Sequence, residues 1–164
     1  RQVQYGTVPA CIFSHPQVAS VGLTEEEALE QGYDMKIGRL ALADVVKGFA
    51  LGLEDTPADG FVKMIVDSET DRILGVHIAG HEAALLLQPF AYLMQSGANR
   101  RVVHNPEIGS QLTMLERGAY RTMTIPSNSV QLIERSVVIH PALSEAPAWV
   151  TANLVPRAEY EPRR

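Results

Sequence analysis

Cysteine is almost missing from this chain, which has a single example, Cys11, in 164 residues. One cysteine excludes an internal disulfide framework, and it suits a reducing compartment. The sequence also lacks a glycine-rich loop of the kind that holds nucleotide phosphates. We therefore expect a cytoplasmic protein without structural disulfides, and no complete redox centre or nucleotide site within the chain itself.

Long apolar runs and an excess of positive charge are missing as well. The longest apolar stretch, residues 83–94, contains Gln88 and Pro89 and is too short to span a bilayer. The net charge is −5, with a pI of about 5.5 and no basic stripe. We expect neither a membrane nor a nucleic acid as partner.

What is present is enough for one globular domain. Hydrophobic residues make up 46% of the chain and charged residues 20%, which is ordinary for a domain with a single core. We predict one domain over residues 1–155, with an insertion at 98–128 and a C-terminal tail at 156–164.

The pattern of elements predicts an α+β fold, with an antiparallel β-sheet flanked by helices. Residues 8–21 are rich in β-branched side chains and are broken at His15-Pro16, which predicts two short strands around a turn. Residues 61–66 and 72–78 predict a hairpin around a polar turn, and 35–43 a strand with one exposed face. Strands joined by hairpins indicate a sheet covered by helices on one side.

Helix signals follow between and after these strands. Thr24 and Glu27 form a capping-box pattern, and Gly32 marks the end of that helix. Residues 82–95 predict a helix that is apolar on nearly every side, as in a core or an interface. A last helix is expected at 145–154, with Ser144 as its N-cap and Pro147 in its first turn.

The most informative segment is 140–145, His-Pro-Ala-Leu-Ser-Glu. It places the imidazole of His140 just before a helix start and the carboxylate of Glu145 five residues later. A carboxylate that accepts a hydrogen bond from one ring nitrogen fixes the tautomer and prepares the other nitrogen to act as a base. The same pattern also suits a surface helix start, with an acid placed favourably on the helix dipole.

Four segments together resemble one family. Residues 8–25, 60–63, 73–80 and 140–145 are similar, in this order, to the C-terminal dimerisation (interface) domain of FAD-dependent pyridine nucleotide-disulfide oxidoreductases. Members of this family include dihydrolipoamide dehydrogenase, mycothione reductase and glutathione reductase. The resemblance covers most of the chain outside residues 98–128 and the tail.

The resemblance implies a function for the longer parent enzyme. It implies a homodimer with upstream FAD and NAD(P) domains that transfers electrons between NAD(P)H and a small dithiol or disulfide. His140 would be the acid–base catalyst for the partner subunit's redox disulfide, with Glu145 as its orienting partner. His140 and Pro141 would lie at the cofactor, and the His140-Pro141 peptide would be cis. The fragment alone would bind no cofactor and would be inactive.

Two other interpretations stay open at this point. A freestanding homodimeric binding or structural module with this fold would also lack a nucleotide loop and a cysteine pair. A metal site at His77 and His81 ranks last, because Gly80 separates a strand from a helix start between them. Cys11, in an apolar strand, is expected to be a buried, inert thiol, and we predict no metal site.

Overall fold

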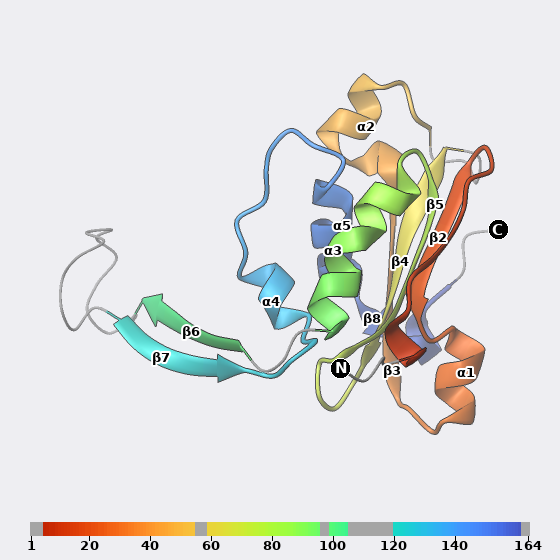
Figure 1. Cartoon of the computed structure of the whole chain (residues 1–164). Coiled ribbons are helices and arrows are strands. Elements are labelled where there is room, and N and C mark those ends of the chain that lie inside the picture. Colours follow the sequence, from red (N-terminus) through yellow and green to blue (C-terminus); the bar gives the residue numbers. More distant parts are fainter. Residues whose placement is uncertain (1–4, 55–58, 96–98, 105–119, 162–164) are drawn as a thin grey trace.

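The computed structural model describes residues 5–54, 59–95, 99–104 and 120–161. Six strands form one sheet in the order β1-β2-β5-β4-β3-β8, and all neighbours are antiparallel (Figure 1). The strands are β1 (Ala10–Ile12), β2 (Gln17–Gly22), β3 (Met35–Ala41), β4 (Gly60–Asp67), β5 (Ile73–Gly80) and β8 (Val155–Pro156). This antiparallel sheet with helices confirms the predicted α+β class.

Along the chain, the helices occur in the segments that connect these strands. The α-helices are α1 (Glu25–Glu30), α2 (Val46–Ala50), α3 (Ala83–Gln95), α4 (Gln131–Glu134) and α5 (Glu145–Trp149). Short 3₁₀ segments occur at Tyr5–Thr7 (η1), Leu42–Asp44 (η2), Val150–Asn153 (η4) and Arg157–Glu159 (η5). The predicted helix 145–154 is thus an α-helix only to Trp149 and a 3₁₀ helix beyond it. No helix in the described part of the chain is both long and apolar enough to cross a membrane.

Local sequence signals explain the strand and helix ends. The turn between β1 and β2 contains the cis peptide His15-Pro16. At α1, the Thr24 hydroxyl accepts a hydrogen bond from the Glu27 amide at 3.2 Å, and Glu27 accepts one from the Thr24 amide at 2.8 Å. This reciprocal pair confirms the predicted capping box.

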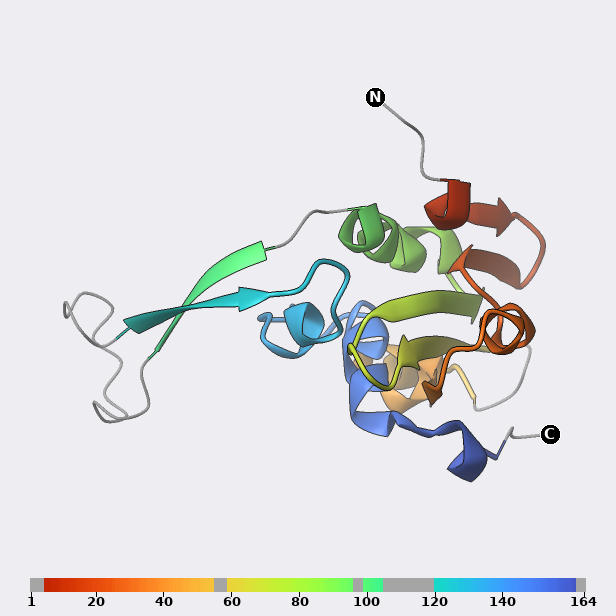
Figure 2. The same cartoon turned by 90° about the horizontal axis from the view of Figure 1, so that it is seen from below.

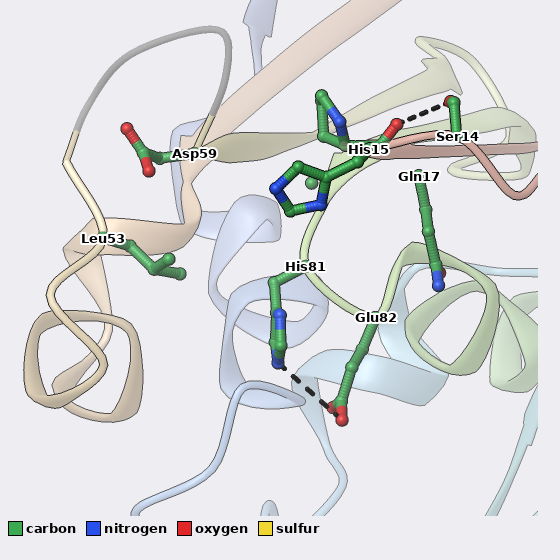
Figure 3. Close-up of a pocket in the computed structure, with 9 residues that line it drawn as sticks. Ser14, His15, Gln17, Leu53, Asp59, His81 and Glu82 are labelled. Atoms are coloured by element: carbon green, nitrogen blue, oxygen red, sulfur yellow. Dashed lines mark hydrogen bonds and ion pairs between the residues drawn. The ribbon is translucent and has the colours of Figure 1, made fainter.

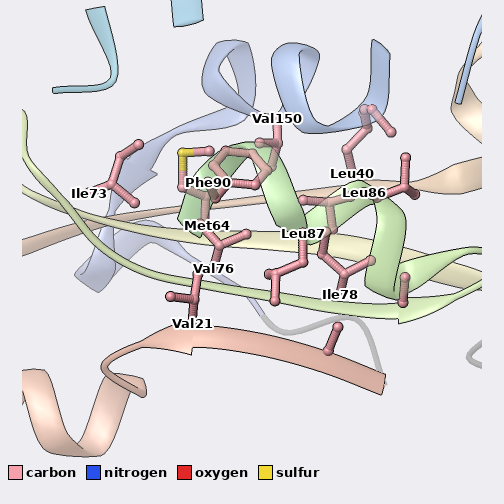
Figure 4. Close-up of a cluster of buried hydrophobic side chains, with 14 of the residues drawn as sticks. Val21, Leu40, Met64, Ile73, Val76, Ile78, Leu86, Leu87, Phe90 and Val150 are labelled. Carbon is pink, nitrogen blue, oxygen red and sulfur yellow. The ribbon is translucent and has the colours of Figure 1, made fainter. Parts of the chain in front are cut away.

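The main core lies between the sheet and the helices α3 and α5. Phe90 and Leu87 of α3 pack on Val76 and Met64 of the sheet, with Val150 beside them (Figure 4). All five are at most 3% exposed. Burying such side chains stabilises the fold by roughly 1.5–3 kcal/mol each.

A second, smaller core covers part of the other face of the sheet. It joins Met35 and Ile37 of β3 to Ala28 of α1 and to Tyr160 near the C-terminus. The prediction that residues 35–43 have one exposed face was therefore wrong. Gly38 lies under the Val150 carbonyl, and Leu40 is buried in the main core, so both faces of β3 are covered.

The residues that follow η4 pair with β3 and pack against the sheet. Val155 and Pro156 pair with Ile37 and Lys36 of β3, and the Lys63 ammonium lies 5.5 Å from the centre of the Tyr160 ring. Pro156 and Tyr160, which were expected to belong to a tail over residues 156–164, therefore take part in the sheet and its packing.

The segment predicted as an insertion contains two strands that the sequence analysis did not predict. β6 (Asn99–His104) and β7 (Tyr120–Ile125) form a separate two-stranded antiparallel sheet. We call this ribbon the arm. Figures 1 and 2 show the arm projecting from the body on the side of α3 and α4, away from the six-stranded sheet.

Candidate functional site

The strongest candidate site is the pair formed by His140 and Glu145. His140 follows the exposed segment that leads from α4, and its peptide bond to Pro141 is cis, as predicted. The His140 side chain is 60% exposed, whereas Glu145 at the start of α5 is 1% exposed. Nδ1 of His140 and Oε2 of Glu145 are 2.8 Å apart. The structure thus brings together the two residues that the sequence selected.

The second carboxylate oxygen of Glu145 is also occupied. Oε1 accepts a hydrogen bond from the Ala142 amide at 2.7 Å, a contact that the sequence analysis missed because it depends on the turn between His140 and α5. The hydrogen bond from His140, followed by that from the Ala142 amide, holds the pKa of the Glu145 carboxyl below its ordinary value. Glu145 is therefore a buried carboxylate with both oxygens satisfied.

This geometry fixes how the imidazole can act. Because an ionised carboxylate only accepts hydrogen bonds, Nδ1 of His140 must carry the shared proton. In the neutral ring, Nε2 then has the lone pair, and no residue in the described ranges hydrogen-bonds to it. Nε2 can take a proton from an external group and later return it.

The helix start beside the pair differs in one respect from the prediction. Ser144 precedes α5, but its backbone is helical and its side chain makes no capping hydrogen bond. Pro147 lies in the first turn, where its missing amide hydrogen costs nothing. The position of the helix start was right, and the predicted role of the Ser144 side chain was wrong.

The surroundings of His140 are exposed and apolar. Val137 is 101% exposed and Ile139 77% exposed, and Pro141 is exposed as well. Scattered apolar side chains are common on protein surfaces, but a cluster beside a charged pair marks a contact site. His140 and Pro141 are therefore open to contact from outside this part of the chain.

An apolar cavity lies next to α5. It is bounded by Leu85, Pro89 and Leu93 of α3, Ile133 of α4 and Pro147 of α5. The outer side of α3 carries two large exposed side chains, Leu85 at 69% and Tyr92 at 70%. We call this outer side of α3, marked by Leu85 and Tyr92, the helical face.

A second cavity has a polar lining and lies beside the start of α3. His15 and Gln17, Asp59, and His81 and Glu82 line it from three separate segments (Figure 3). No spacing in the sequence could have grouped them, because the sheet brings distant turns together. His81 Nε2 lies 3.8 Å from Glu82 Oε1, and the Gln17 side chain accepts a hydrogen bond from the Ala84 amide at 3.3 Å. Gln17 therefore serves the start of α3.

The other residues considered in the sequence are His77, His81 and Cys11. His77 Nε2 lies 3.0 Å from the Leu23 carbonyl oxygen, while His81 lines the polar cavity. Among the described residues, no group of three or more His, Cys, Asp or Glu side chains is arranged to hold a metal ion. Cys11 is half-buried and packs against the main core, so it is less buried than predicted.

Comparison with known proteins decides the family. The family described as pyridine nucleotide-disulphide oxidoreductase, dimerisation domain, matches residues 8–122. The chain belongs to this family. The matched segment covers more than half of the sequence but ends before His140, so the family assignment does not rest on that residue.

Curated relatives of this dimerisation domain are oxidoreductases. The chain is 47% identical over 89 residues to dihydrolipoyl dehydrogenase of Rhizobium etli, covering 54% of this chain and 18% of that protein. It is 42% identical over 90 residues to mycothione reductase of Mycobacterium tuberculosis, covering 55% and 19%. The chain therefore spans less than a fifth of the length of these relatives.

Solved structures support the fold. LpdA from Mycobacterium tuberculosis superposes with a TM-score of 0.67 at 16% identity, covering 93% of this chain and 26% of LpdA. The HOCl-induced flavoprotein disulfide reductase RclA from Escherichia coli gives 0.60 at 20% identity, covering 91% and 26%. In each case this dimerisation domain corresponds to about a quarter of the larger chain.

Proposed function

We propose that this dimerisation domain works within a larger FAD-dependent disulfide oxidoreductase and supplies His140 as the acid–base group for the partner subunit's redox disulfide. The observation that carries the proposal is the exposed imidazole held by a fully buried carboxylate, at 2.8 Å. An imidazole that served only the fold would have no need to present Nε2 to the outside. Its exposed apolar surroundings suit contact with a second subunit.

His140 would act on sulfur through proton transfer. Nε2 takes the proton of a substrate thiol, which leaves the thiolate that attacks a disulfide sulfur. The sulfur that leaves as a thiolate can then recover the proton from the imidazolium. Glu145 holds the ring in place through both steps and stabilises its cationic form.

The cofactors belong to other parts of the proposed enzyme. FAD, when bound, supplies electron transfer between a nicotinamide, NAD or NADP, and the disulfide. The exposed His140 and Pro141 fit a contact with a flavin that other domains hold. The substrate class is a small dithiol or disulfide, and the proposed location is the cytoplasm.

The helical face is the proposed contact between the two copies. Leu85 and Tyr92 are large, apolar and exposed on the outer side of a helix whose inner side is buried. A two-fold axis would use such a patch twice. Leu85 also lines the apolar cavity together with Ser144 and Pro147, which follow His140 closely in the chain, so pairing on this face would bring each imidazole close to the second subunit.

The test is a His140→Ala substitution in a full-length flavoprotein that contains this domain. We expect turnover with the dithiol substrate to fall by about 10²–10⁴-fold, because the base is gone. Flavin reduction by the nicotinamide, followed by absorbance in a stopped-flow instrument, should be unchanged. His81→Ala, which removes another exposed imidazole, is the matched control and should retain turnover. Normal dithiol turnover in the His140 variant would refute the assignment.

A further inference from the structure

The arm is the one part of the described fold whose strands pair only with each other. β6 and β7 are joined in register from Asn99 opposite Ile125 to His104 opposite Tyr120, and neither strand joins the six-stranded sheet. Both views show it extending away from the body (Figures 1 and 2). An isolated two-stranded ribbon is marginal in water and leaves two open edges. The arm therefore needs a covering surface.

The base of the arm is fixed to the body. Asn128, just after β7, is 6% exposed and has a left-handed backbone. Its side chain donates to the Ile73 carbonyl at 2.7 Å, and its own carbonyl accepts from the Ile73 amide at 2.8 Å. Two residues later, the Val130 amide donates to the Asp71 carbonyl at 2.9 Å. These bonds tie the returning end of the arm to the β4–β5 hairpin.

The arm also lies where a second copy would have to be. β6 begins four residues after α3 ends at Gln95, and the arm extends on the side of α3 that is turned away from the sheet (Figure 1). Leu85 and Tyr92 of the helical face lie on that outer side, because the opposite side of α3 is buried against the sheet. A copy that covers these two residues would therefore lie on the same side of the body as the arm.

Charge favours contact between the arm and the body of such a copy. The two strands contain Arg100, Arg101 and Arg121 and no Asp or Glu, whereas the chain as a whole has a net charge of −5. A basic arm repels a second basic arm and attracts an acidic body. Of the possible occupants, the body of a second copy therefore matches the arm in both position and charge.

We propose that the arm of each copy lies on the body of a second copy, so that two arms are exchanged across the dimer and extend its interface. This rests on the proposed function, since it takes the helical face as the contact between copies. The arrangement is reciprocal, as two-fold symmetry requires.

Two variants of the 164-residue chain test the arm. In the first, residues 99–125 are replaced by four Gly and Ser residues, which can close the gap because Asn99 and Ile125 are paired neighbours. In the second, R100E/R101E reverses two charges and deletes nothing. Its matched control, K47E/R157E, reverses two exposed charges elsewhere on the body.

Sedimentation equilibrium gives the dimer dissociation constant of each protein. We expect about a tenfold or larger increase in Kd for both arm variants and no change for K47E/R157E, with circular dichroism reporting folding. Rising salt should weaken the wild-type dimer and leave the arm-deleted dimer less affected.

The outcomes separate this inference from the proposed function. A wild-type dimer whose Kd is unchanged in both arm variants overturns the exchange of arms and leaves the helical face in place. A monomeric wild-type chain at high concentration overturns both. Cross-linking adds a direct check. A photoprobe is attached to Thr122→Cys in a Cys11→Ser background, and ¹⁴N and ¹⁵N chains are mixed so that cross-links between copies can be told from those within one copy. Cross-links between copies support the exchange, and cross-links only within one copy refute it.

Discussion

Glu145 is the residue on which the geometry of the candidate site depends. It is buried, yet both oxygens of its carboxylate accept a hydrogen bond, one from His140 and one from the Ala142 amide. A buried charge without such partners would strongly destabilise the fold. Glu145 thus links the stability of the start of α5 to the orientation of the His140 ring.

This linkage predicts a specific dependence on pH. The hydrogen bond from His140 holds the pKa of Glu145 lower in the folded chain than in the unfolded chain. The ionised carboxylate therefore stabilises the fold above the ordinary carboxyl pKa of about 4.3, and this contribution is lost as the pH falls through the lowered folded value. Between about pH 5 and pH 3, we expect wild type to lose more stability than Glu145→Gln, which has no carboxyl to titrate.

Urea unfolding midpoints across that pH range provide the measurement. Glu26→Gln removes an exposed carboxylate of α1 and should follow the wild-type curve. Parallel curves for wild type and Glu145→Gln would show that the carboxylate has no special partner in the folded state.

At the scale of elements, packing of η4 on β3 holds α5 in place. A Cβ added at Gly38 would lie 2.6 Å from the Val150 carbonyl oxygen and 3.2 Å from the Leu154 side chain. Because a backbone carbonyl cannot swing away, Gly38→Ala must displace η4, and α5 directly precedes η4. We expect a loss of about 1–3 kcal/mol in the free energy of unfolding.

Gly6→Ala is the control for that experiment. A Cβ at Gly6 meets nothing within 4 Å, so its unfolding free energy should stay close to wild type in the same denaturant titration. A Gly38→Ala protein as stable as Gly6→Ala would mean that η4 is not held against β3.

Most elements could be predicted from the sequence because their signals are local. The break at His15-Pro16, the capping box at Thr24 and the polar turn before β5 each specify a boundary within a few residues. The covered face of β3 could not be predicted in this way, since Val150 reaches Gly38 from more than a hundred residues away. The arm strands were missed because residues 99–104, Asn-Arg-Arg-Val-Val-His, show no regular alternation.

The candidate site was predicted in part for the same reason. His140 and Glu145 lie five residues apart, so their pairing depends on one local turn. Their contrast in exposure, 60% against 1%, depends on how α5 packs into the core. The polar cavity around His15 and His81 combines three distant segments, so no local sequence pattern could predict it.

At the scale of the whole molecule, the helical face should determine the oligomeric state. A charge on either Leu85 or Tyr92 would be buried without a partner in a dimer that uses this face. We expect Leu85→Glu and Tyr92→Glu to shift the chain to monomers in sedimentation velocity experiments. Leu29→Glu on α1, also an exposed leucine, should remain dimeric. Dimers of undiminished strength in both helical-face variants would place the contact elsewhere.

The central claim is that His140 serves the disulfide of the other subunit, and subunit mixing tests it most directly. In a full-length flavoprotein disulfide reductase that contains this domain, one subunit carries His140→Ala and the other lacks the redox cysteines, so the account predicts that each homodimer is inactive. If the imidazole acts across the dimer, random mixing restores about one quarter of the wild-type activity, since half of the dimers are mixed and each has one intact site. If His140 acts within its own subunit, the mixture has no restored activity, and the account is contradicted. A His140→Ala homodimer that is itself active, as expected if the imidazole has no role, contradicts the account as well.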